Sequence, residues 1–149
     1  MHGLGNSYIY VNLFEETIAE EALPDIARRV SDVHFGIGSD GLITIGPSRK
    51  ADFRMRIFNM DGSEGQSCGN GLRCVAKYVH DRGLTDKTEF DVETGGGIAR
   101  VVLKTKNGRT EAVTVDMGQP RLAKRSVPML GDPDSVTINE PVDIPGAPG

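Results

Sequence analysis

Phe58-Asn-Met-Asp-Gly-Ser-Glu-Gly-Gln-Ser-Cys-Gly-Asn-Gly-Leu-Arg-Cys74 is the stretch around which the rest of the chain is organised. It contains both cysteines, and it joins a strand-like segment to a helix-like one. A Gly-rich turn at a helix start exposes backbone N–H groups, which favour an anion. Cys68 lies at this turn, where the helix dipole favours the thiolate. The stretch therefore predicts a carboxylate-binding turn with a reactive cysteine beside it.

The segment after this turn has the apolar spacing of a helix that buries one face. Apolar residues fall at i, i+3, i+4 and i+7, namely Leu72, Val75, Ala76 and Val79. The spacing predicts a helix from about Gly69 to Asp81, with Gly83 as its stop.

The two cysteines have different expected roles. Polar or small residues flank Cys68, which is typical of an open turn, whereas Cys74 lies beside apolar residues of the helix and is expected to pack. Six residues at about 100° each separate the two by roughly 120° around a helix axis. We therefore expect neither a disulfide nor a shared metal site.

Most of the remaining segments predict strands. Runs rich in β-formers or alternating in polarity occupy 8–12, 42–45, 53–58, 89–94, 98–105 and 110–116. Asn107-Gly108 predicts a hairpin between the last two runs. A smaller helix is expected to begin near Pro24. One main helix against a curved, mixed sheet is the simplest way to bury the apolar helix face, so the fold class is α+β.

The composition changes after Gly118, where prolines accumulate and periodicity fades. We therefore divide the chain into a first domain, 1–121, and a Pro-rich, loosely ordered tail or linker, 122–149. One short strand is expected within the tail, at 135–139.

Composition limits the classes of partner. The net charge of −4 and the absence of Trp give no basis for nucleic-acid binding. No apolar run approaches the roughly 20 residues of a membrane span, and the N-terminus does not resemble a signal peptide. We expect a cytoplasmic protein with no membrane partner.

Several other motifs lack the neighbouring residues or elements that their usual function requires. The G-x-G-x-x-G pattern of 36–41 is followed by a strand-like run and not by a helix, which favours a tight turn over a nucleotide site. Residues 59–62 resemble part of a calcium loop, but Cys68 would occupy its twelfth position. The scattered histidines predict no metal site. Arg54 and Arg56 are expected to form a solvated strand face.

Four segments together resemble the N-terminal half of the diaminopimelate epimerase family. They are His2-Gly-Leu-Gly-Asn6, Gly36-Ile-Gly-Ser-Asp-Gly41, Phe58-Asn-Met-Asp-Gly-Ser-Glu64 and Ser67-Cys-Gly-Asn-Gly-Leu-Arg-Cys74. The resemblance extends from residue 1 to about Arg121, and its specificity comes from four motifs in the same order.

The resemblance implies a cofactor-independent isomerase that interconverts LL- and meso-diaminopimelate in lysine and peptidoglycan biosynthesis. Members have two similar halves, each a strongly curved, barrel-like sheet around a central helix, and bind the substrate between them. Inversion at Cα needs a base on one face and an acid on the other, and each half supplies one cysteine. The helix N-termini favour the negative charge that develops on the substrate.

The resemblance also assigns residues. Cys68 matches the first catalytic cysteine. Gly69 and Asn70 match positions whose backbone binds substrate, and Asn6 and Asn59 match substrate-binding asparagines. Gly41 stands where some members have a glutamine that contacts the substrate.

The chain has no second Cys-Gly-x-Gly turn. We therefore expect a fragment that needs a C-terminal half, is weakly active or inactive alone, and exposes a half-cleft that favours pairing, including a homodimer. Three alternatives stay open: a related amino-acid racemase or isomerase with the same fold, a non-catalytic domain that binds a carboxylate, and, more weakly, a thiol redox role.

Overall fold

The computed structural model describes residues 1–127 and 129–139 and divides the chain into two compact units, Met1–Met117 and Gly118–Gly149. The first unit holds the strands and α-helices. In chain order these are β1 (His2–Gly3), β2 (Asn6–Asn12), the short 3-10 helix η1 (Glu20–Ala22), α1 (Leu23–Ser31), β3 (Gly41–Gly46), β4 (Phe53–Asn59), β5 (Glu64–Gly65), α2 (Gly69–Asp81), β6 (Glu89–Thr94), β7 (Gly97–Lys106) and β8 (Arg109–Val115).

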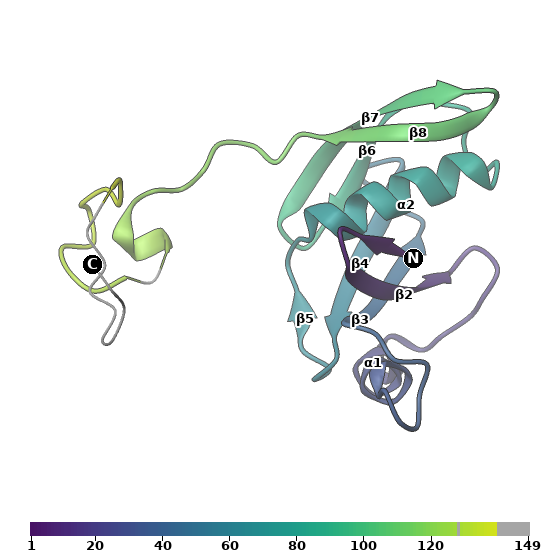
Figure 1. Cartoon of the computed structure of the whole chain (residues 1–149), viewed down its shortest axis with the longest axis horizontal. Helices are drawn as coiled ribbons and strands as arrows, with labels where there is room; N and C mark the ends of the chain where they lie inside the picture. Colours follow the sequence, from purple (N-terminus) through teal and green to yellow (C-terminus); the bar gives the residue numbers. More distant parts are fainter. Residues whose placement is uncertain (128, 140–149) are drawn as a thin grey trace. The chain divides into compact units, whose positions relative to one another are not determined.

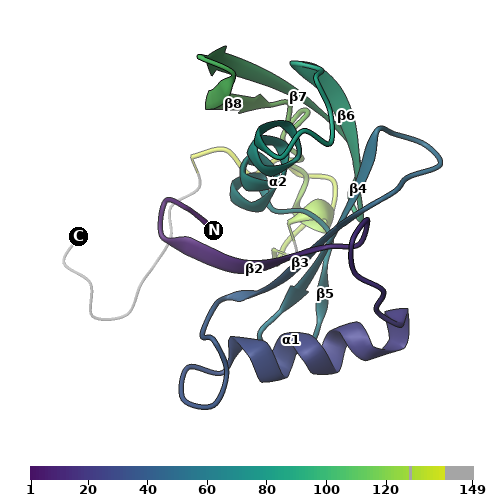
Figure 2. The same cartoon turned by 90° about the vertical axis from the view of Figure 1, so that its right-hand side faces the viewer.

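The strands of the first unit form one mixed sheet. Its order over the described residues is β1-β2-β3-β4-β6-β7-β8, with β5 beside β4. The β2–β3 and β4–β6 pairs are parallel, and the other neighbours are antiparallel. The sheet curls around α2, which lies within its concave side (Figures 1 and 2). The predicted α+β fold, a strongly curved sheet around a central helix, is confirmed.

The main core lies between α2 and the concave face. The four predicted apolar residues of α2 are fully buried, and they pack against strand residues that include Ile43, Met55, Val92 and Val101. Burying each of the Leu and Val side chains contributes roughly 1.5–3 kcal/mol, so this face anchors the helix to the sheet.

A second, smaller core lies on the opposite face of the sheet, where α1 packs (Figure 2). Leu23 and Ala27 of α1 contact Leu42 and Phe58, and all four are buried. The expected alternation of β4 therefore holds only as far as Ile57, because α1 buries Phe58 on the other side.

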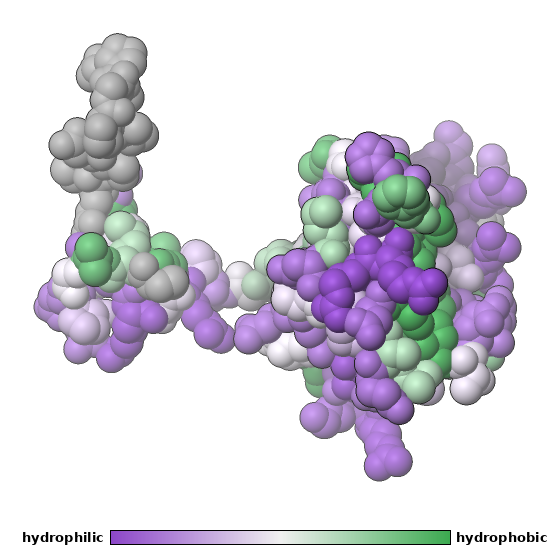
Figure 3. Space-filling model, turned by 90° about the horizontal axis from the view of Figure 1, so that it is seen from below, coloured by the Kyte–Doolittle hydropathy of each residue, from purple (hydrophilic) through white to green (hydrophobic). Residues whose placement is uncertain are grey.

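Hydrophilic residues cover much of the surface seen from below, with hydrophobic residues visible between them (Figure 3).

The expectation that Arg56 lies on a solvated strand face is wrong. Its guanidinium donates to both carboxylate oxygens of Glu64 at 2.7 and 3.0 Å and to Glu20 at 3.0 Å. It also lies 5.0 Å from the ring centroid of Phe58. β5 places Glu64 beside β4, so Arg56 is held between two acidic partners, whereas Arg54 is exposed as expected.

The strand predicted at 135–139 is also wrong. In the second unit, Val136 forms only an isolated antiparallel bridge with Ala123. Val136 and Ile138 are both more than half exposed, so these side chains have no core to pack against that would stabilise a longer strand. The remaining structure of the described part of this unit is the short 3-10 helix η2 (Lys124–Ser126). The predicted tail residues 128 and 140–149 lie outside the described residues. The proposed domain boundary at residue 121 stays a prediction.

Within the described part of the chain, no helix combines the length and apolar character that crossing a membrane requires.

Asp81 ties the end of α2 to β8. Its carboxylate accepts hydrogen bonds from the Thr110 backbone N–H at 2.8 Å and from Lys77 Nζ at 2.7 Å. Partial burial by itself raises the pKa of Asp81, but the hydrogen bonds from Lys77 and Thr110 outweigh it and hold that pKa well below its ordinary value. The carboxylate therefore stabilises the fold in its ionised form.

Asp81→Asn is expected to lower the free energy of unfolding at pH 7 by about 1–3 kcal/mol, since it weakens charge-assisted hydrogen bonds. The folded-state pKa lies below the unfolded one, so this stabilisation is present above about pH 4 and is lost as the pH falls further. Urea unfolding at several pH values measures it, with exposed Asp86→Asn as the control. A difference from wild type that stays constant down to pH 2 would contradict the assignment.

Candidate functional site

The Cys68 thiol caps the N-terminus of α2. Cys68 has an extended backbone conformation, with φ −146° and ψ 105°, and its Sγ accepts a hydrogen bond from the Gly71 N–H at 3.2 Å. Cys68 is half-buried, whereas Cys74 is buried inside α2, as its apolar neighbours predict. The sulfur thus takes the place of a capping oxygen and lies at the positive end of the helix dipole.

Asn6, at the start of β2, reaches the same thiol. The Cys68 S–H donates to Asn6 Oδ1 at 3.4 Å, across 62 residues of sequence. The close approach of β1 to α2 makes this contact possible. A Cβ at Gly3 would lie only 3.2 Å from the Cβ of Asn70, so a larger residue there would crowd the two segments.

The glycines of the turn let α2 approach its neighbours closely. A Cβ at Gly71 would lie 2.5 Å from the Ile43 Cδ1, so only glycine fits without movement of the Ile43 side chain. A Cβ at Gly69 would lie 3.3 Å from the Met117 Sδ. The side chain of Asn70 accepts a hydrogen bond from Arg73, which fixes its direction along the first turn of α2.

Asn59, at the end of β4, belongs to a neighbouring turn. Its Nδ2 donates to the Ser63 Oγ at 3.0 Å, and Asp61 accepts from the Ser63 backbone N–H at 2.8 Å. Asn59 also stands opposite Gly41 in the β3–β4 ladder. The structure thus joins Cys68 to Asn6 by a direct hydrogen bond, and Asn70 lies in the first turn of the helix that Cys68 caps. Asn59 lies one residue before Met60, whose N–H donates to the Asp40 carbonyl at 3.1 Å.

Two residues at this site were missed by the sequence reasoning. Asp40 accepts from the Asn6 Nδ2 at 2.8 Å and from the Ser7 N–H at 2.7 Å. Burial raises the pKa of the Tyr8 phenol, the nearby Cys68 and Asp40 side chains act in the same direction, and a hydrogen bond with Asn6 opposes them. Asp40 lies within the Gly-rich stretch 36–41, so its position in that motif was the available signal. For Tyr8, the strand pattern of residues 8–12 gave no signal that this side chain would lie at the site.

Gly41 has no room for a side chain. A Cβ there would lie 2.1 Å from the Phe58 carbonyl oxygen and 2.9 Å from the Tyr8 Cε1. A glutamine contact with substrate is therefore excluded at this position unless the strands move apart.

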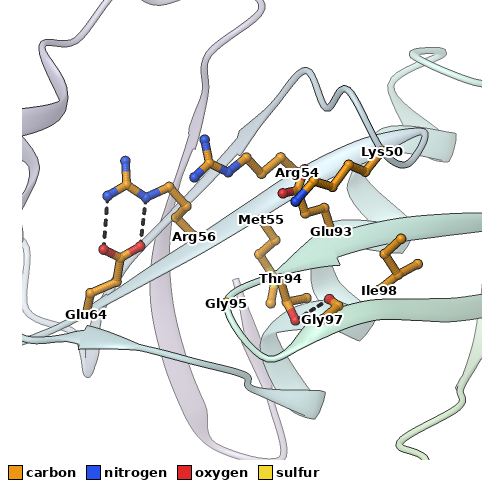
Figure 4. Close-up of a pocket in the computed structure, with 10 residues that line it drawn as sticks. All are labelled: Lys50, Arg54, Met55, Arg56, Glu64, Glu93, Thr94, Gly95, Gly97 and Ile98. Carbon is orange, nitrogen blue, oxygen red and sulfur yellow. Dashed lines mark hydrogen bonds and ion pairs between the residues drawn. The ribbon is translucent and has the colours of Figure 1, made fainter.

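A cavity of about 510 Å³ is lined by residues of β4 to β7 and of the turns beside them (Figure 4). Its charged lining residues are Lys50, Arg54, Arg56, Glu64 and Glu93, and none of the predicted site residues belongs to it. The Arg56–Glu64 ion pair lies at one side of this group of residues (Figure 4). Among the described residues, no group of three or more His, Cys, Asp or Glu side chains is placed to hold a metal ion.

Comparison with solved structures defines the class of fold. A hydroxyproline epimerase from Agrobacterium vitis is similar with a TM-score of 0.60 and 18% identity, over 76% of this chain and 39% of that one. At this identity the similarity concerns the fold alone. The chain has the curled half-barrel fold that also occurs in this amino-acid epimerase.

Sequence comparison then defines the family. The family model described as diaminopimelate epimerase matches residues 1–123, so this chain belongs to the diaminopimelate epimerase family. A diaminopimelate epimerase of Bacillus velezensis is 59% identical over 140 residues, which are 94% of this chain and 49% of the relative. That of Bacillus subtilis strain 168 is 57% identical over the same shares. The chain spans about half the length of these curated relatives.

Proposed function

We propose that this chain is the N-terminal half of a diaminopimelate epimerase, in which Cys68 transfers a proton at the substrate Cα. The observation that carries the proposal is the position of the thiol at the N-terminus of α2, between the Gly71 N–H and Asn6 Oδ1. The family membership and the names of the relatives support diaminopimelate as the substrate.

The two contacts of Cys68 suit a group that must act in both directions. The Gly71 N–H donates to sulfur and so favours the thiolate, which can remove a proton. Asn6 Oδ1 accepts from the S–H and so favours the thiol, which can deliver one. In one direction Cys68 takes the Cα proton as the second thiol donates to the opposite face, and in the other direction the roles reverse. This chemistry needs no cofactor.

We assign substrate binding to residues around the thiol. Backbone N–H groups of Gly69 and Asn70 lie in the first turn of α2, where a carboxylate is favoured. Stabilising that carboxylate also favours the negative charge that develops when the Cα proton leaves. Asn6 and Asn59 are assigned to the polar groups of the substrate.

The second catalytic thiol is assigned to a C-terminal half. Leu4 is 92% exposed and Met60 is 58% exposed, and they adjoin the segments of Asn6 and Asn59. Apolar residues at the rim of a site are typical of a surface that a partner covers. We assign the segment from residue 122 onward to the linker toward that half. We also propose a homodimer and a cytoplasmic location. The two free thiols support the location, because the cytoplasm keeps thiols reduced.

The isolated chain is expected to have little or no epimerase activity, because one face of Cα lacks a catalytic group. Addition of the separately produced C-terminal half of the Bacillus velezensis relative is expected to restore turnover. Solvent deuterium incorporation at Cα of LL-diaminopimelate measures both, and the C-terminal half alone is the control. Full activity of the isolated chain would overturn the two-halves proposal. Turnover of proline or hydroxyproline in place of diaminopimelate would favour a related racemase.

A further inference from the structure

We infer that Asp40 is a positioning residue that fixes the side-chain amide of Asn6, so that its oxygen and not its NH2 group faces the Cys68 thiol. The inference rests on the proposed role of Cys68. Asp40 does not touch the sulfur in the described contacts and acts through Asn6.

Asp40 is anchored on three sides. Its backbone N–H donates to the Ser7 carbonyl at 2.8 Å, and its own carbonyl accepts from the Met60 N–H at 3.1 Å. One carboxylate oxygen, Oδ2, accepts from both the Ser7 N–H at 2.7 Å and the Asn6 Nδ2 at 2.8 Å. The backbone hydrogen bonds hold the Asp40 carboxylate at a fixed place beside β2. The acceptor for the Asn6 NH2 group is therefore in position whatever the direction of the amide.

The chemistry of the two groups decides the direction of the amide. An ionised carboxylate only accepts hydrogen bonds, so the amide must turn its NH2 group toward Asp40. The oxygen and nitrogen of a planar amide point in different directions, which leaves Oδ1 toward Cys68, at 3.4 Å from Sγ. A group at position 40 that both donates and accepts would permit either direction.

The direction of the amide affects the proton on the thiol. In the observed arrangement, Asn6 stabilises the S–H form and the Gly71 N–H stabilises the thiolate. A flipped amide would donate to sulfur as well, and both contacts would then favour the thiolate. Among the described residues, Tyr8 and Tyr10 on β2 also interact electrostatically with Cys68, and Arg73 follows it on α2, where it donates to the Asn70 side chain. Asp40 thus keeps Cys68 able to serve as an acid.

Iodoacetamide labelling of Cys68 over a range of pH tests the inference on the chain itself, with peptide-resolved mass spectrometry to separate Cys68 from Cys74. Asp40→Asn is expected to move the midpoint of labelling to lower pH and to increase the labelling rate at pH 7 by about threefold or more. Asp61→Asn is the control, because its carboxylate lies in the neighbouring turn and accepts from Ser63. It is expected to leave the midpoint unchanged.

Asp40→Asn also removes a negative charge, so the same change is made in an Asn6→Ala background. If Asp40 acts through Asn6, Asp40→Asn has no further effect there. An equal shift in both backgrounds would mean that the charge acts directly, and it would overturn the inference. If Asp40→Asn does not fold, Asp40→Ser replaces it, because a hydroxyl also both donates and accepts. A wild-type Cys68 that labels like an ordinary thiol would instead count against the proposed function.

Discussion

Cys68→Ser is expected to abolish the epimerase activity that this chain supports together with a C-terminal half. A serine hydroxyl is not ionised near neutral pH and cannot take a proton from Cα as a thiolate does, so a loss of about 10²–10⁴-fold or more is expected. The fold should be retained, because serine is among the preferred N-cap residues and its oxygen can accept from the Gly71 N–H.

Cys74→Ala is the matched control for the thiol. Cys74 is buried within α2, and its removal is expected to cost about 1 kcal/mol of stability through lost packing, with activity largely kept. Deuterium incorporation at Cα and urea unfolding, measured on both variants, separate the two effects. An equal loss of activity from both changes would contradict the assignment of Cys68 to proton transfer and of Cys74 to packing.

Gly41→Ala is expected to lower the free energy of unfolding by more than about 2 kcal/mol, because overpacking against a fixed backbone forces strands apart. The added Cβ would lie 2.1 Å from the Phe58 carbonyl oxygen. This is a backbone atom of the neighbouring strand β4, and it cannot move away by a change of rotamer. Urea unfolding at neutral pH measures the effect.

Gly46→Ala is its control, at the other end of β3. A Cβ there would lie 3.4 Å from the nearest atom, the Leu13 Cβ, which is close to ordinary contact. A small effect is expected. Equal stability of the two variants would show that β3 and β4 separate easily at Gly41, and it would reopen this position to a glutamine that contacts substrate.

The strands and the main helix could be predicted because their signals are local. The apolar spacing after Cys68 predicted α2 at Gly69–Asp81, as observed. Asn107-Gly108 predicted the β7–β8 hairpin, and both residues have positive φ, 52° and 74°, as a tight hairpin turn requires. The failed strand at 135–139 had the same kind of local signal but no core to pack against.

The contacts of the site could not be predicted from residue spacing. The bond between Cys68 and Asn6 spans 62 residues, and the bond between Asn6 and Asp40 spans 34. The first bond depends on how β1 and β2 bring Asn6 to the start of α2, and the second depends on the parallel pairing of β2 with β3, which Asp40 directly precedes. The resemblance to a family assigned roles to Asn6 and Cys68 but none to Asp40, although Asp40 lies in one of the four motifs, because the motif does not show which side chain Asp40 contacts.

The sequence by itself determined that a Gly-rich turn places a thiol at the start of an amphipathic helix, because turn residues and helical periodicity act over a few neighbouring positions. Only the tertiary structure decided which groups from distant parts of the chain contact that thiol. The curl of the sheet around α2 brings Asn6 to one side of the sulfur, and Asp40 turns the Asn6 oxygen toward it. The same curl leaves the outer face of β3 and β4 to α1, which buries Phe58. These outcomes depend on long-range strand pairing and on the close approach that glycines such as Gly71 and Gly41 permit.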